Sequence, residues 1–166
     1  MADESSLQNE IHQRLPFRSH AEEVSLGVVR TATLVKRGVA QVVGPYGITP
    51  AQYNVLRILR GAGAKGLPTL DVRERLIEEA PGITRLVDKL QRAGLVRRSR
   101  PRADRRQVLC FITAKGLKLL QELDPIIKHG DEIGASGLSV QEQQHLIGLL
   151  NKVRAAIAAH NETPQP

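Results

Sequence analysis

The segment 81–110 constrains the fold most, because an amphipathic helix pattern is followed at once by two short strand patterns. Its apolar residues recur at i, i+3, i+4 and i+7, which predicts one buried helical face. These residues are Ile83, Leu86, Val87 and Leu90. Gly94 then predicts a left-handed helix cap. Residues 95–100 and 107–112 predict two strands, and the turn chemistry of residues 101–104 predicts that they form a hairpin.

The same thirty residues carry the whole charge excess of the chain. They contain nine Lys or Arg residues against two acids, Asp88 and Asp104, and the rest of the chain has 15 basic and 15 acidic residues. A cluster of arginines is usually only a solvated face. Here the cluster coincides with a helix, a glycine cap and a hairpin turn, and this coincidence favours binding to a polyanion.

Five further helices are predicted from capping patterns and apolar periodicity. Ser19 with Glu22, and Ser139 with Glu142, resemble capping boxes. Thr49-Pro50-Ala51-Gln52 repeats the pattern with proline at the first helical position. The predicted extents are about 20–43, 49–61, 68–77, a helix that begins after Thr113 and reaches a kink or break at Pro125, and a helix that begins after Ser139. Residues 7–15 predict either a short helix or a disordered arm.

Two helices, a basic helix and a basic hairpin, in that order, are typical of a winged helix-turn-helix. The predicted fold class is mainly α with a small β wing, with about six helices plus a two- or three-stranded hairpin. An α-helix fits the major groove of DNA, and a thin hairpin (the wing) can follow the backbone into the minor groove. The chain therefore predicts a reader of double-stranded DNA.

The predicted contacts fall into two groups. On the basic helix they are Thr84, Arg85, Asp88, Lys89 and Arg92, and on the wing they are Arg98, Arg100, Arg102, Asp104, Arg105 and Arg106. Asp104 is expected to hold Arg106 in a fixed pose through a charge-assisted hydrogen bond. Two simpler interpretations stay open: Thr84 serves only the first helical turn, and Asp88 with Arg92 form an ordinary i, i+4 helix pair.

Several motifs in order resemble the MarR family of transcriptional regulators. They are Ile48 to Leu56 (ITPAQYNVL), Ile83 to Leu90 (ITRLVDKL), Gly94-Leu95-Val96, Asp104-Arg105-Arg106, and Ile112 to Gly116 (ITAKG). The resemblance implies a cytoplasmic homodimer that binds pseudo-palindromic promoter DNA, usually as a repressor. It also implies release by a small aromatic or phenolic effector or by thiol oxidation.

The resemblance further implies a division of the chain into functional parts. These are a flexible arm (1–18), an N-terminal dimerisation helix (19–47), a DNA-binding domain (48–113), C-terminal dimerisation helices (114–160) and a disordered tail (161–166). By the same resemblance, Tyr53, Arg57 and Arg98 are expected to face an effector crevice. The Pro81-Gly82 start of the basic helix departs from the family pattern and leaves open which base edges it reads.

Other functions find little support in the sequence. Two Tyr, two Phe and no Trp leave little for a single-strand stacking platform. The sequence contains no phosphate loop, no nucleophile elbow and no convincing paired carboxylates, so it does not predict an enzyme. The five histidines are scattered without metal-ligand spacing, so neither a metal nor a cofactor is predicted. Cys110, the only cysteine, is expected to be an inert core residue. No signal peptide or membrane-spanning run is predicted. An architectural protein that binds DNA without sequence preference remains the alternative.

Overall fold

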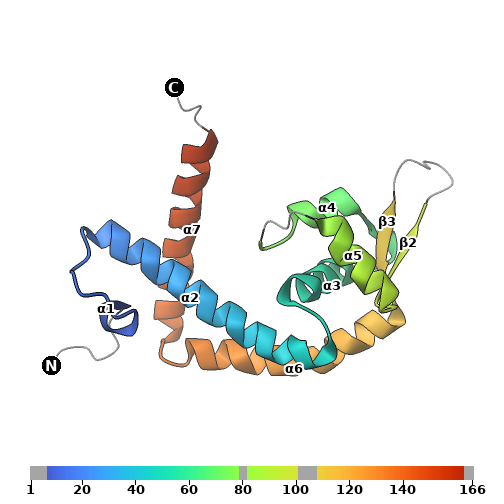
Figure 1. Cartoon of the computed structure of the whole chain (residues 1–166), viewed down its shortest axis with the longest axis horizontal. Coiled ribbons are helices and arrows are strands. Elements are labelled where there is room, and N and C mark those ends of the chain that lie inside the picture. The colour runs from blue at the N-terminus through green and yellow to red at the C-terminus, as the bar shows by residue number, and fades with distance from the viewer. Residues whose placement is uncertain (1–6, 79–81, 101–107, 163–166) are drawn as a thin grey trace. The chain divides into compact units, whose positions relative to one another are not determined.

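The computed structural model describes residues 7–78, 82–100 and 108–162, and within them the predicted fold class is confirmed. Along the chain, one long helix comes before the winged part and another comes directly after it (Figure 1). The helices are α1 (Leu7–Glu10), α2 (His20–Val43), α3 (Pro50–Ala62), α4 (Thr69–Glu74), α5 (Ile83–Arg92), α6 (Ala114–Ala135) and α7 (Val140–Glu162). The strands are β1 (Leu67–Pro68), β2 (Val96–Ser99) and β3 (Leu109–Ile112), and short 3-10 turns lie at Gly44–Tyr46 (η1) and Gly63–Lys65 (η2).

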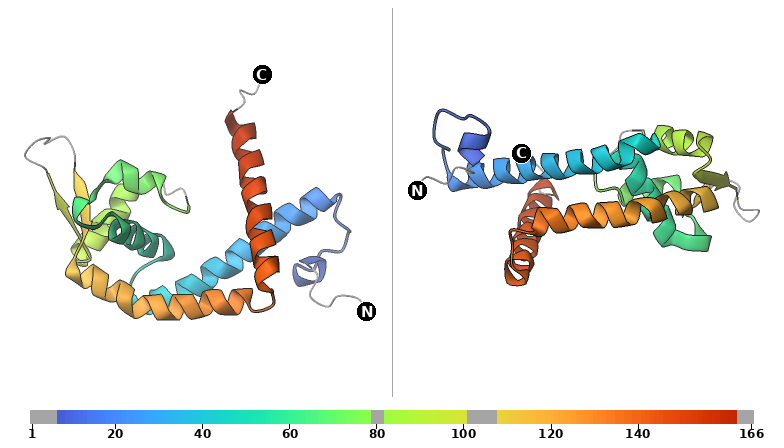
Figure 2. Two further views of the ribbon diagram at one scale, coloured as in Figure 1. Left: turned by 180° about the vertical axis from the view of Figure 1, so that it is seen from behind. Right: turned by 90° about the horizontal axis from the view of Figure 1, so that it is seen from below.

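The predicted hairpin strands pair as β2 and β3. Val96 lies opposite Ile112 and Ser99 opposite Leu109, in antiparallel register. A third strand, β1, adds to the other side of β3, so the order is β1-β3-β2. Because β1 has only two residues, it carries no alternation that a sequence pattern could reveal. Figure 2 shows β2 leaving the end of α5 and β3 leading into α6.

The capping patterns predicted the helix starts correctly. At α3, Thr49 Oγ1 accepts from the backbone N–H of Gln52 (3.3 Å), and the Gln52 side chain accepts from the N–H of Thr49 (3.0 Å). At α2, Ser19 Oγ accepts from Glu22 N–H (3.2 Å), but the Glu22 carboxylate accepts from Arg18 instead of returning to Ser19. The hydrogen bonds that the side chain and the backbone N–H of Arg18 donate lower the pKa of the Glu22 carboxyl. Thr113 caps α6 and Ser139 caps α7, as expected.

The predicted end of one helix is wrong, and so is the predicted break at Pro125, whereas the alternative kink there stays a prediction. The helix predicted over 68–77 ends at Glu74, because the N–H of Ile77 donates to Asn54 Oδ1 on α3 (3.0 Å), outside the helical ladder. The helix α6 is unbroken from Ala114 to Ala135, although Pro125 removes one backbone donor. The buried Leu120 and Leu123 anchor the turns before the proline, and this packing outweighs the lost hydrogen bond.

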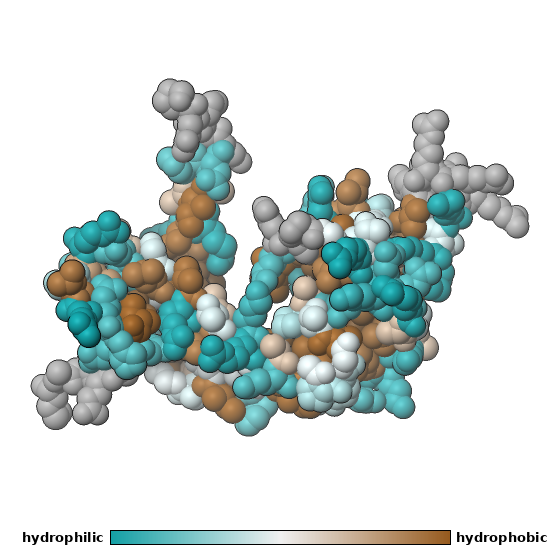
Figure 3. Space-filling view, in the orientation of Figure 1, coloured by the Kyte–Doolittle hydropathy of each residue, from teal (hydrophilic) through white to brown (hydrophobic). Residues whose placement is uncertain are grey.

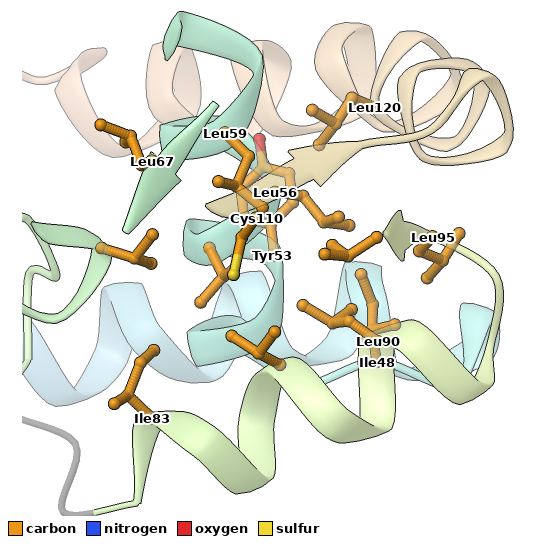
Figure 4. Packing of buried hydrophobic residues seen from close by; sticks show 14 of the residues in the cluster. Ile48, Tyr53, Leu56, Leu59, Leu67, Ile83, Leu90, Leu95, Cys110 and Leu120 are labelled. Carbon is orange, nitrogen blue, oxygen red and sulfur yellow. The ribbon is translucent and has the colours of Figure 1, made fainter. Parts of the chain in front are cut away.

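One apolar core joins α3, α5, α6 and the sheet (Figure 4). The side chains of Val87 and Leu90 on α5 are fully buried in it, together with Leu56 and Leu59 of α3. Cys110 is also fully buried, which agrees with its expected core position, and its Sγ lies 3.5 Å from Thr69 Oγ1. The core therefore supports both the basic helix and the root of the wing.

The chain forms two compact units, residues 1–127 and residues 128–166, which divide within α6. The first unit contains the winged part and α2. The second contains the end of α6 and all of α7.

Candidate nucleic-acid interface

Helix α5 separates its apolar and polar faces as the sequence predicts. Ile83, Val87 and Leu90 are buried in the core, and the side chains expected to contact DNA lie on the solvent side. Thr84, Arg85, Lys89 and Arg92 are all exposed, whereas Asp88 is half-buried. The helix therefore presents three basic side chains and a hydroxyl to solvent along one element.

The start of α5 suits an anion. Gly82 precedes the helix in the left-handed region (φ 110°), and within the described part of the chain no side chain caps the first turn. Uncapped N–H groups at a helix start attract phosphate, because the helix dipole adds to their partial positive charge.

The end of α5 is fixed against the start of α6. Gly94 has φ 73°, so the predicted left-handed cap is confirmed, and the N–H of Leu95 bonds the carbonyl of Leu90 (2.9 Å). Lys115 Nζ donates to the carbonyl of Ala93 (2.8 Å), and Thr113 Oγ1 donates to that of Gly94 (2.7 Å). The ITAKG motif thus binds the carbonyls of the two residues that directly follow the basic helix.

Two consecutive arginines on β2 face opposite ways. Arg97 is exposed, and its guanidinium lies 4.1 Å from the ring centroid of Phe111, its partner across the sheet. Arg98 turns toward α5, where Nη1 lies 2.5 Å from Asp88 Oδ1 and Nη2 donates to the carbonyl of Thr84 (3.3 Å). The wing and the basic helix are therefore joined by an ion pair.

The i, i+4 pair considered between Asp88 and Arg92 does not form. Arg92 Nε reaches only the backbone carbonyl of Asp88 (3.4 Å), because the Asp88 carboxylate is taken by Arg98. No pattern in the sequence pointed to this exchange of partner.

The remaining wing residues are partly outside the described chain. Arg100 is exposed and follows directly after β2. Arg102, Asp104, Arg105 and Arg106, with the predicted Asp104–Arg106 contact and the turn, lie outside the described residues.

The three residues expected at an effector crevice occupy different surroundings. Tyr53 is 5% exposed within the core, and Arg57 is exposed with its guanidinium 5.8 Å from the Tyr53 ring centroid. Arg98 is engaged with α5. None of the three lines the cavity described next.

A cavity of about 390 Å³ lies where η1, the end of α5 and the start of α6 meet. Its lining combines apolar and charged side chains, among them Tyr46, Ile48, Leu95, Lys115, Lys118, Leu119 and Glu122. The volume is within the range of small-molecule sites. Sequence reasoning missed it, because its walls come from three separate segments.

The residues that the structure describes offer neither a metal site nor a membrane span. No group of three or more His, Cys, Asp or Glu side chains there could hold a metal ion. None of the helices found in those ranges is long and apolar enough to cross a membrane.

A basic helix and a wing on one core define a winged helix-turn-helix DNA-binding protein. Comparison with known proteins agrees: a MarR family profile matches residues 46–107. The HTH-type regulator YkoM of Bacillus subtilis is 34% identical over 107 residues, which cover 64% of this chain and 68% of YkoM. The chain belongs to the MarR family of transcriptional regulators and is not an enzyme.

Two solved structures extend the likeness beyond the winged part. A MarR transcription factor from Planctomyces limnophilus is 34% identical, with a TM-score of 0.63 over 82% of this chain and 98% of that one. BpsR of Bordetella bronchiseptica, whose DNA binding is regulated by 6-hydroxynicotinic acid, is 26% identical, with a TM-score of 0.71 over 80% of this chain and 99% of BpsR.

Proposed function

We propose that this regulator is a homodimeric repressor that binds a pseudo-palindromic site in promoter DNA and leaves it when a small effector binds. The observation that carries the proposal is the exposed basic face of α5 beside a wing joined to it by an ion pair. Arg85, Lys89 and Thr84 are assigned to the major groove, where arginine and lysine meet guanine acceptors. The arginines of the wing beyond β2, which are Arg100, Arg102, Arg105 and Arg106, are assigned to its approach to the backbone and minor groove.

Exposed apolar side chains support the homodimer. On α2, Val24, Val29 and Val35 are each more than half exposed, and on α7 so are Ile147 and Ile157. Figure 3 shows apolar residues reaching the surface on both helices. Such residues need a partner surface, and a second copy supplies one. A two-fold dimer would place its two basic helices about 34–36 Å apart, one turn of DNA.

The DNA-binding part is tested by competition on the protein's own upstream region. A footprint locates the site, and binding is then measured at physiological salt against unlabelled random duplex. We expect the specific site to bind at least about a thousandfold tighter than random DNA. If random duplex competes equally well, the protein is architectural and the proposal fails. Footprints overlapping the promoter, with transcription rising when the protein is absent, would support repression.

For the effector, we propose the cavity between η1, α5 and α6. Its apolar walls suit a flat ring, and Lys118 in its lining suits a carboxylate. A ligand there would touch the same joint that holds the end of α5, which links occupancy to DNA binding. The crevice expected near Tyr53 and Arg57 is the competing location, and a second protomer would complete it.

The effector site is tested by DNA release with a panel of phenolic acids and, separately, with peroxide. We expect an acid to release the DNA and Lys118→Gln to weaken that response. Lys128→Gln is the matched control, because Lys128 is exposed on the same helix outside the cavity. Unchanged release by Lys118→Gln combined with loss by Arg57→Gln would move the site to the competing crevice.

A further inference from the structure

Asp88 and Arg98 stand on the face expected to meet DNA, yet their charged groups meet each other. Their side chains are 41% and 23% exposed, and Nη1 lies 2.5 Å from Oδ1. Arg98 also donates to the Thr84 carbonyl in the first turn of α5 (3.3 Å). Its Nε is buried without a hydrogen-bond partner among the described residues. The guanidinium is therefore turned into the angle between wing and helix and away from solvent.

We propose that Asp88 and Arg98 are a positioning pair that locks α5 to β2, and that neither side chain reads DNA. This inference rests on the proposed function, in which α5 and the wing enter the grooves. The lock fixes the wing relative to the helix, so both parts reach the DNA in one arrangement.

The alternation of β2 explains why Arg98 is available for this role. Side chains two apart in a strand share a face, so Arg98 follows the buried Val96 toward the helices. Arg97 takes the opposite face, where it lies over Phe111. The alternation of side chains along β2 therefore places Arg97 and Arg98, which carry the same charge, on opposite faces of the sheet.

Charge balance supports the same assignment. An unpaired carboxylate on a DNA-reading helix would repel phosphates, whereas an ion pair presents no net charge. The pair is partly buried, so salt screens it less than a surface pair. Loss of either member leaves the other charge partly desolvated and without its partner.

The decisive variant is Asp88→Asn, because the two interpretations predict opposite signs. If the acid only repels DNA, removing it tightens binding to every sequence. If it positions Arg98, binding to the specific site weakens by at least about threefold and the ratio of specific to random binding falls. Glu74→Gln is the control for loss of one exposed acid, from the end of α4. Tighter binding by Asp88→Asn at both kinds of DNA would overturn the proposal.

Arg98→Gln is compared with Arg97→Gln, which removes an equal charge from the neighbouring position of β2. A direct phosphate contact contributes about 0.9 to the salt slope. We expect Arg98→Gln to keep the wild-type slope but to lose specificity, and Arg97→Gln to keep the specificity ratio. A slope reduced by about 0.9 with an unchanged ratio would make Arg98 a phosphate contact and refute the lock.

The double variant completes a thermodynamic cycle. If the residues act as a pair, Asp88→Asn and Arg98→Gln together cost little more specificity than either alone, whereas additive losses contradict the pair. Circular dichroism of each variant confirms that it is folded. Merely lowered stability would reduce specific and random binding equally, so the ratio separates that effect from positioning.

A measurement without DNA separates this proposal from the proposed function. Amide hydrogen exchange of the free protein should quicken in Val96–Ser99 and in the first turn of α5 in Asp88→Asn, and not in Glu74→Gln. If the wild type shows no sequence preference but exchange still quickens, the proposed function fails and the lock stands. Unchanged exchange in Asp88→Asn would overturn the lock whatever the DNA result.

Discussion

Arg85 lies in the first turn of α5 on the exposed side of a helix whose other side is buried, so its guanidinium is free to enter a groove. We expect Arg85→Ala to relax discrimination at particular base pairs by about 1–3 kcal/mol, the value of a bidentate guanine contact. Binding to operators with single-base changes measures this. Arg37→Ala, an exposed arginine on α2, is the control. Uniform weakening at all sites would make Arg85 a phosphate anchor instead.

For single residues, the sequence predicted features that depend on near neighbours in the chain and did not predict contacts between separate segments. The exposure of Arg85 and Lys89 follows from the helical period alone. The pairing of Asp88 with Arg98 does not, because it depends on the turn at Gly94 and on which face of β2 points to the helix. The burial of Tyr53 could not be predicted from the sequence either, because an aromatic residue suits a core and a ligand crevice equally.

Among the elements, the joint between α5 and α6 is tightly packed at Gly116. A Cβ added to Gly116 would lie 2.5 Å from the Leu95 carbonyl oxygen and 2.7 Å from Ile112 Cγ1. We expect Gly116→Ala to destabilise the fold by about 1–3 kcal/mol, because backbone must shift to admit it. Urea unfolding measures the change.

Gly61→Ala is the matched control for that prediction. Gly61 lies in α3 with nothing within 4 Å of an added Cβ, so alanine should stabilise the helix by up to about 1 kcal/mol. If both substitutions change the free energy of unfolding equally, the backbone at the joint accommodates the added Cβ without cost and does not hold the end of α5.

Some boundaries of the helices and strands are set by neighbours in sequence, and others are set by tertiary contacts. Helix starts at α2, α3 and α7 were predictable, because Ser19, Thr49 and Ser139 cap their own neighbours in sequence. The early end of α4 and the strand β1 were not, because their partners, Asn54 and β3, are distant in sequence. The continuity of α6 through Pro125 likewise depends on tertiary packing, which no local rule contains.

At the scale of the whole molecule, the described residues of one chain include a single basic helix beside a wing, so a site of two half-sites needs two chains. Linking two readers makes the second contact intramolecular, which raises affinity by about 10²–10⁴-fold over one half-site. The exposed apolar side chains of α2 and α7 are the surfaces available for that linkage. The molecule's affinity and its association state are therefore expected to change together.

Ile147→Arg tests this dependence, since a charge at a 59% exposed apolar position on α7 opposes burial in a dimer. We expect sedimentation to shift from twice the 18.2 kDa chain mass toward one, and full-site affinity to fall by about 10²–10⁴-fold. Binding to an isolated half-site should not change. Gln144→Arg adds the same charge at an exposed polar position of α7 and should alter neither quantity. A monomeric Ile147→Arg protein with full-site affinity intact would show that the chain reads DNA alone.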